Sequence, residues 1–129
     1  MSNIKAQMPN ECQNPNAKKY DLEERTAIFG ENIIDFARSL EKNIINIPLI
    51  KQVIRSGTSI GANYCEADGA ESKKDFKHKI RLCKKESKET KHWLRMLAKA
   101  NENKVEECRK LWQEAQELTL IFSSIAKDD

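Results

Sequence analysis

Hydrophobic residues recur along this chain at intervals of three and four, the spacing that places side chains on one face of an α-helix. The clearest run lies in the second half of the chain: Phe76, Ile80, Cys83, Ser87, Thr90, Leu94 and Leu97. Similar runs occupy residues 22–40 and 105–125. Few segments alternate between polar and apolar residues with a period of two, so a β-sheet is not expected.

Residues typical of helix ends divide the chain into four helices. Asp21 and Ser72 each precede an acidic residue by three positions, a spacing that resembles a capping box. Pro48 suits the first turn of a helix, and Gly69 suits a C-terminal stop. The predicted helices span roughly residues 21–43, 48–68, 72–100 and 103–126. Four amphipathic helices with short connections pack most simply as an all-α, up-down-up-down antiparallel four-helix bundle.

The second predicted helix has an unusual polar side. One side carries the apolar or small residues of a core stripe: Val53, Gly57, Ile60 and Tyr64. The other side, called the polar face below, consists of Gln52, Arg55, Ser56, Ser59, Asn63 and Glu66. A solvated face is usually built from Lys and Glu, whereas these residues suit close approach by another surface. We therefore interpret the polar face as a structural contact between helices or subunits.

Two details of this helix lead to further expectations. Arg55 and Glu66 lie eleven residues apart, about 16 Å along a helix, so each needs a partner on another helix or subunit. Gly57 and Gly61 each destabilise a helix interior by about 1 kcal/mol relative to Ala. Because small residues one turn apart let helices approach closely, we interpret them as positions of tight packing.

Composition agrees with a helical protein and reveals a strong charge asymmetry. The 129 residues include only four Gly and three Pro, and the net charge is +3. Residues 73–99 contain eleven Lys or Arg and three acidic residues, a charge of +8, whereas residues 21–41 carry −4. Each position of a basic stripe follows a core position of the third helix: Lys77, Arg81, Lys84, Lys88, Lys91 and Arg95.

Such a stripe has two interpretations that both stay open. A continuous row of cations is typical of a surface that contacts the phosphates of a nucleic acid. A charge run is also typical of a solvated face, and the acidic first helix offers it a partner within the chain or on a neighbouring subunit. Trp93 and Trp112 lie on or beside apolar stripes, so we place them in the core or an interface and not on a base-stacking surface.

Catalytic and metal-binding patterns are weak in this sequence. It has no phosphate loop, nucleophile elbow or His-Glu-x-x-His motif, and His78 and His92 are interpreted as surface residues. The cysteines form no C-x-x-C pair, so neither a metal nor a cofactor is expected; Cys65, Cys83 and Cys108 are predicted to be small core residues. Glu86 and Glu89 are interpreted as helix surface or as partners of a buried Arg55. No apolar segment has the length of a membrane span. We expect no enzyme activity, a cytoplasmic location, and a flexible tail at residues 1–20.

The segment Arg55-Ser-Gly-Thr-Ser-Ile-Gly-Ala-Asn-Tyr-Cys-Glu-Ala strongly resembles a signature of the bacterial 23S ribosomal RNA intervening-sequence proteins. That signature reads R-S-x-x-S-I-x-A-N-x-x-E. Downstream, Lys85-Glu-Ser-Lys-Glu-Thr-Lys-His-Trp-Leu94 is similar to a subgroup motif, K-E-x-x-E-T-x-x-W-L. The resemblance covers roughly residues 20–126.

This resemblance implies a four-helix bundle that assembles into a ring-like homopentamer and has no established enzymatic activity. Related accessory proteins of diversity-generating retroelements are thought to bind nucleic acid and a reverse transcriptase, so the resemblance implies these as partners. Two hypotheses follow. In the first, the protein is a non-catalytic oligomer that binds RNA or DNA through the basic stripe. In the second, it is a protein–protein scaffold whose basic helix pairs with acidic surfaces of neighbouring protomers.

Overall fold

The computed structural model of the protein describes residues 21–127, which fold into four α-helices and one short 3-10 helix. The α-helices are α2 (Leu22–Ser39), α3 (Asn46–Asp68), α4 (Lys73–Ala100) and α5 (Val105–Ile125), and the 3-10 helix η2 (Glu102–Lys104) precedes α5. The described residues contain no β-strand. The tail predicted at residues 1–20 lies outside the described residues.

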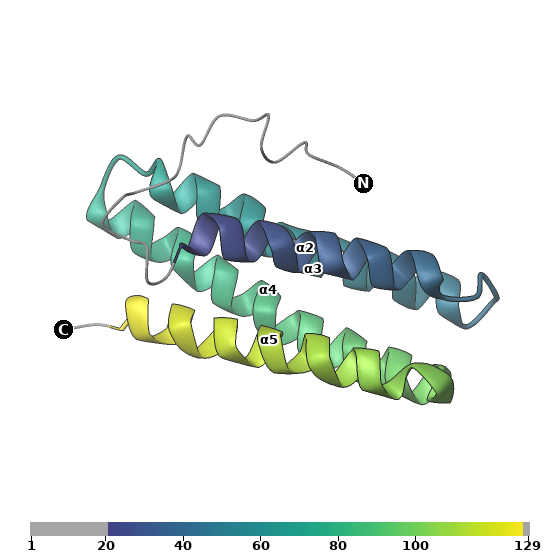
Figure 1. Cartoon of the computed structure of the whole chain (residues 1–129). Coiled ribbons are helices and arrows are strands. Elements are labelled where there is room, and N and C mark those ends of the chain that lie inside the picture. The colour runs from purple at the N-terminus through teal and green to yellow at the C-terminus, as the bar shows by residue number, and fades with distance from the viewer. Residues whose placement is uncertain (1–20, 128–129) are drawn as a thin grey trace.

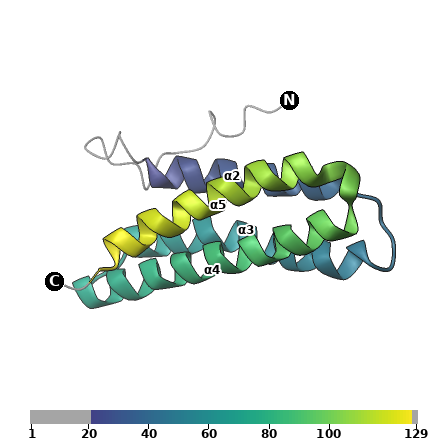
Figure 2. The ribbon, with the colours of Figure 1, turned by 90° about the horizontal axis from the view of Figure 1, so that it is seen from below.

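Successive helices run in alternate directions and lie side by side, as Figures 1 and 2 show. Helix α3 packs against both α2 and α4, and α4 in turn packs against α5. The contact between α2 and α5 is the least extensive of the four sides. The predicted all-helical fold with alternating helix direction is confirmed.

The predicted caps lie at three helix ends. Asp21 accepts a hydrogen bond from the Glu24 backbone N–H at 3.2 Å, and Ser72 accepts one from the Asp75 N–H at 3.0 Å. These bonds satisfy amide groups that have no partner within the first turn of a helix. Gly69 follows the last residue of α3 as predicted.

The connection between α2 and α3 differs from the prediction, because α2 ends at Ser39 and not near residue 43. The Lys42 ammonium donates to the carbonyl oxygens of Ala37 at 3.2 Å and Leu40 at 2.8 Å, satisfying acceptors at the end of the helix. The Asn43 side chain accepts from the Asn46 N–H at 2.8 Å, so α3 begins two residues before Pro48. Pro48 still lies in the first turn.

A reciprocal amide pair joins α3 to the end of α4. Asn46 is buried, and its side-chain amide and that of Asn101 exchange two hydrogen bonds of 2.9 Å each. Asn101 also begins the 3-10 turn, so the last α-helix starts at residue 105 and not at 103. This pair satisfies a buried polar group and fixes the ends of α3 and α4 relative to each other.

The core lies along the predicted apolar stripes, and α2 and α3 approach closely at the two glycines of α3. The largest fully buried hydrophobic side chains are Phe29, Phe122, Ile33, Ile60, Ile80, Leu94, Leu97 and Leu118. A Cβ atom on Gly57 would lie 2.9 Å from Ile33 Cγ1, and one on Gly61 would lie 3.2 Å from Thr26 Oγ1. The interpretation of Gly57 and Gly61 as close-packing positions is confirmed.

Candidate nucleic-acid interface

The two flanks of α4 carry side chains of different character, because its core residues divide the helix surface. Cys83, Ser87 and Thr90 are buried between the neighbouring helices. The carboxylates Glu86 and Glu89 each precede a core position and face α3. The basic stripe follows the core positions and borders α5. Each flank therefore meets a different neighbour.

On the flank that faces α3, both carboxylates are engaged by Arg55. Its guanidinium lies 3.3 Å from Glu86 and also pairs with Glu89, while Gln52 accepts a hydrogen bond from Arg55 Nε at 3.0 Å. Glu89 accepts a second bond, of 2.9 Å, from the Trp93 indole N–H. The predicted pairing of Arg55 with another helix is confirmed, whereas the alternative in which Arg55 is buried is wrong. The Arg55 side chain remains 46% exposed, because it reaches the carboxylates across the outer edge of the α3–α4 contact.

The rest of the polar face also serves the α3–α4 contact. Ser56 and Thr90 are fully buried, and their hydroxyl groups are hydrogen-bonded at 2.9 Å. Glu66 pairs with Lys79 of α4 at 2.7 Å, which raises the pKa of Lys79. Asn63 and Ser59 are bonded within α3 through the Asn63 amide and the Ser59 carbonyl. The polar face therefore positions helices within one chain, as the structural interpretation expected.

On the other flank, the middle of the basic stripe lines a shallow hollow of about 290 Å³. Its lining consists of Arg81, Lys84, Lys85 and Lys88. Within the described part of the chain, Lys84, Lys85 and Lys88 form no ion pair. Lys85 was not part of the predicted stripe, because it lies one residue farther around the helix. The only sequence feature that indicated a place for Lys85 in the hollow was its position next to Lys84.

The ends of the basic stripe are engaged with the C-terminal part of the chain. Lys77 donates to the backbone carbonyl of Lys127 at 3.1 Å. Lys91 donates to the Gln116 side chain and lies over the Trp112 ring, 5.2 Å from its centroid. The structure thus places all six predicted residues along α4 but divides them into a central basic hollow and two ends that contact other groups.

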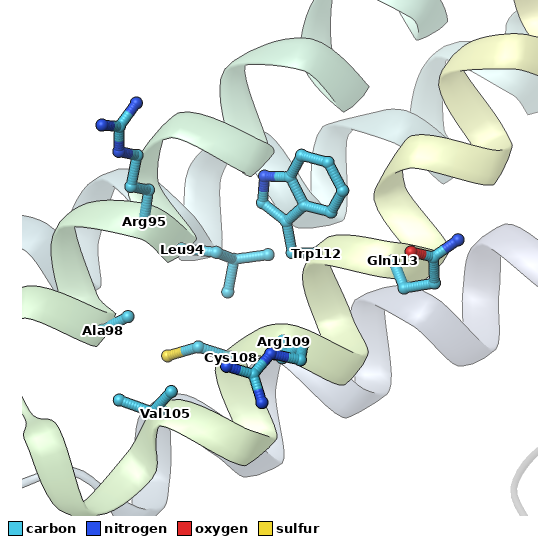
Figure 3. Close-up of a pocket in the computed structure, with 8 residues that line it drawn as sticks. All are labelled: Leu94, Arg95, Ala98, Val105, Cys108, Arg109, Trp112 and Gln113. Carbon is cyan, nitrogen blue, oxygen red and sulfur yellow. The ribbon is translucent and has the colours of Figure 1, made fainter.

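Beyond Lys91, Arg95 lines a second pocket, of about 380 Å³, between α4 and α5. Figure 3 shows Arg95 extending from α4 and Trp112 projecting from α5 into the space between the helices. Trp112 is 38% exposed, so it does not belong to the core of the chain, and its predicted alternative placement, in an interface, stays a prediction. Its ring lies beside the Lys91 ammonium and lines the pocket together with residues of α4.

The ion pairs that join the acidic helix α2 to another helix do not involve the basic stripe of α4. Arg25 of α2 reaches α5, where it pairs with Glu114 at 2.7 Å and Glu117 at 2.9 Å. The Glu114 carboxylate, by hydrogen bonding above all, raises the pKa of Arg25 further above its usual range. Because α2 packs on α3, it gives the central lysines of α4 no partner within the described chain.

The cysteines agree with the predicted core placement in two of three cases. Cys83 and Cys108 are buried, and burial raises their pKa values to about 12 and about 11. Cys65 is exposed and lines a groove between α2 and α3, so its predicted burial is wrong. The small side chain of Cys65 suggested a core position, but its side of α3 faces the groove.

Among residues 21–127, no group of three or more His, Cys, Asp or Glu side chains could hold a metal ion. Among the helices of the described chain, none is long and apolar enough to cross a membrane.

The chain is similar to known proteins in both fold and sequence. No curated protein matches the chain. A solved structure of a protein with unknown function, from the S23 ribosomal protein family of Bacteroides thetaiotaomicron, shares 29% sequence identity and a TM-score of 0.73. The match covers 82% of this chain and 98% of that chain. The model of the 23S rRNA-intervening sequence protein family matches residues 18–124, so the chain belongs to this family.

Proposed function

We propose that this protein is a non-catalytic, oligomeric four-helix-bundle protein that binds RNA or DNA through the basic stripe of α4. The observation that carries the proposal is the hollow lined by Arg81, Lys84, Lys85 and Lys88. The three lysines of this lining have no acidic partner within the described residues. Phosphate groups are the ligands that such a row of amines and guanidinium groups is suited to contact.

The position of the carboxylates supports this assignment. Glu86 and Glu89 are the only acidic residues of α4 beyond its first turn, and Arg55 engages both on the opposite flank. They are therefore unable to neutralise the basic hollow. Lysine contacts to phosphates do not read base sequence, so the proposed binding is general and strongly dependent on salt.

The ring-like homopentamer implied by the family resemblance is part of this proposal. In a ring, the same basic hollow is repeated on every protomer. Repetition raises the overall affinity for one nucleic acid chain without any new type of contact.

A second function, a protein–protein scaffold, is favoured by a different observation. Helices α2 and α3 form a groove of about 340 Å³ lined mainly by small and apolar residues, among them Ala27, Gly30 and Ala62. Glu23 and Glu31 also line this groove. An acidic groove of this kind suits a basic helix of a neighbouring protomer, which would cover the lysines of α4.

Charge reversal separates the two functions. We expect Lys84→Glu combined with Lys88→Glu to abolish most binding to a structured RNA and to duplex DNA. The variant should lower the salt dependence by about one phosphate contact per lysine. The measurement is affinity across a salt series, with oligomer mass from light scattering.

The matched control is Lys51→Glu combined with Lys110→Glu. It changes the net charge equally at two exposed lysines outside the basic hollow. Retained affinity in the first variant would refute the nucleic-acid proposal. Loss of oligomers in that variant, with no nucleic-acid binding by the wild type, would establish the scaffold instead.

A further inference from the structure

The pocket between α4 and α5 combines an exposed aromatic ring with cationic side chains that continue the basic hollow. Its interior includes Leu94, Ala98 and Val105, and Trp112 forms part of its wall (Figure 3). Trp112 is the only exposed aromatic residue among the large exposed hydrophobic residues of the described chain. An exposed tryptophan beside unneutralised cations is unusual for a surface that serves only solubility.

We infer that this pocket receives an unpaired base of a single-stranded nucleic acid, which stacks on Trp112 while Arg95 contacts an adjacent phosphate. The inference rests on the proposed nucleic-acid function and adds to it a preference for unpaired strands. Every base presents an aromatic face, so stacking on tryptophan tolerates any sequence. Bases of a duplex are already stacked and are unavailable to the ring.

The charges around the pocket favour an anionic, aromatic ligand. Arg95 has no ion-pair partner within the described residues, whereas Arg109 on the other wall pairs with Glu106. Arg95 is therefore the stronger candidate for a phosphate contact. Gln113 also lines the pocket, and its amide carries both donors and an acceptor for the edge of a base.

The ring itself is held in place by contacts that leave the pocket open. The Lys91 ammonium stands over the Trp112 ring at 5.2 Å from the centroid and also donates to Gln116. Lys91 is not part of the pocket lining, so this contact does not occupy the pocket. A cation over the ring fixes its orientation in advance of binding.

The spacing along α4 agrees with one continuous strand. Lys88 lines the basic hollow and Arg95 lines the pocket, and seven residues of helix separate them. This interval corresponds to about 10 Å, or about three nucleotides at the rise of a stacked strand. One short segment could therefore place phosphates in the hollow and a base in the pocket.

The test compares two ligands and three variants of the full chain. The ligands are a short single-stranded RNA of mixed sequence and a blunt RNA duplex that contains the same strand. We expect Trp112→Leu to weaken binding of the single strand about tenfold, the effect of losing one stacked base. Binding of the duplex should not change. Trp112→Phe, which keeps an aromatic ring, should retain most of the affinity.

Trp93→Leu is the matched control, because Trp93 lies on the other flank of α4 and contacts Glu89. It should leave the affinity for both ligands unchanged, and thermal unfolding checks that each variant is folded. Fluorescence gives a second measurement: binding of the single strand should quench emission in the wild type, and much less in Trp112→Phe.

The outcomes distinguish this inference from the proposed function. Equal affinity of wild type and Trp112→Leu for the single strand would refute the stacking site. If, in that case, the variant with Lys84→Glu and Lys88→Glu nevertheless lost binding, the proposed nucleic-acid function would remain supported without the stacking site. Equal losses for single strand and duplex in Trp112→Leu would also refute the site. Absence of binding to either ligand by the wild type would overturn both proposals.

Discussion

On the side of α4 that faces α3, Glu86 and Glu89 meet Arg55, and the hydroxyl groups of Ser56 and Thr90 meet in the interior. On the side that borders α5, Lys84 and Lys88 meet no acidic partner within the described residues. Both flanks belong to one helix, yet the first is occupied by intramolecular contacts and the second is left positively charged. The difference separates the part of α4 that stabilises the bundle from the part available to a ligand.

This separation follows from the position of the acidic residues and not from the net charge. If Glu86 and Glu89 lay two positions later in the sequence, at positions 88 and 91, they would stand within the basic stripe and neutralise it. In their actual positions they are engaged by Arg55, which also contacts Gln52. In the proposed function, the polar face of α3 therefore acts indirectly, by engaging the carboxylates of α4 on the flank away from the basic hollow.

The largest expected effect is a loss of stability when a residue at the α3–α4 contact is replaced by Leu. Replacement of a lysine on the basic flank by Leu provides the comparison. Thr90→Leu enlarges a fully buried side chain and leaves the Ser56 hydroxyl without its partner, so the free energy of unfolding should fall by about 3 kcal/mol. Lys88→Leu, two residues away on an exposed position, should change it by less than about 0.5 kcal/mol. Urea denaturation measures both values.

The same pair of variants should behave in the reverse way toward nucleic acid. Lys88→Leu should weaken binding, whereas folded Thr90→Leu protein should bind as the wild type does. Equal stability losses for the two substitutions would show that the flanks are not divided in the manner described.

A second prediction concerns the buried thiols between the helices. Burial raises the pKa of Cys83 to about 12 and that of Cys108 to about 11, from an ordinary value of 9.0. The unfolded chain therefore loses these protons at lower pH than the folded chain does, and stability decreases as pH rises above about 9. Between about pH 8.5 and pH 10, each thiol should lower the free energy of unfolding by about 1 kcal/mol.

The Cys83→Ala variant should show a smaller decrease over this interval, and combining it with Cys108→Ala should remove a further part. Urea denaturation at each pH provides the values, and only their dependence on pH is compared, because either substitution also changes packing. An unchanged dependence in the double variant would contradict the account of buried thiols.

Hydrophobic periodicity predicted the four helices and most of the core, because burial on one side of a helix leaves a regular pattern in the sequence. The pairing of Arg55 with another helix was also predictable, since Arg55 and Glu66 are too far apart along α3 to meet. The residue at which α2 ends could not be predicted from the hydrophobic pattern. It depends on Lys42 and Asn43, whose side chains satisfy backbone groups in a connection that the periodic pattern does not describe.

The candidate site was predicted in part. The six residues of the basic stripe lie along α4 as expected, but the sequence did not show that Lys85 joins the hollow. The exposure of Trp112 was not predicted, for a related reason. This residue sits at a core position of the helical pattern, and only the packing of α4 against α5 leaves its large ring at the surface. The exposure of Cys65 could not be predicted from the sequence either, because it depends on the groove between α2 and α3.

The smallest expected effect concerns the ion pairs that occupy the α3-facing flank. Arg55→Ala removes a cation from Glu86, whose side chain is 15% exposed, and from Glu89. Because the Arg55 side chain is itself 46% exposed, solvent screens the pair, and stability should fall by about 0.5–1 kcal/mol. A double-mutant cycle of Arg55→Ala with Glu89→Gln, measured by urea denaturation, isolates the pairwise part of this value.

The coupling energy should decrease when salt is added, because exposed charges are screened. The control cycle uses Arg38 and Asp35, an exposed pair within α2 whose nearest charged atoms are 3.7 Å apart, and its coupling should be smaller. A coupling for Arg55 and Glu89 that is no larger than this control would mean that their contact does not contribute to the α3–α4 interface. The buried hydroxyl groups and the apolar core would then hold this flank alone, and the carboxylates would be free to turn toward the basic stripe.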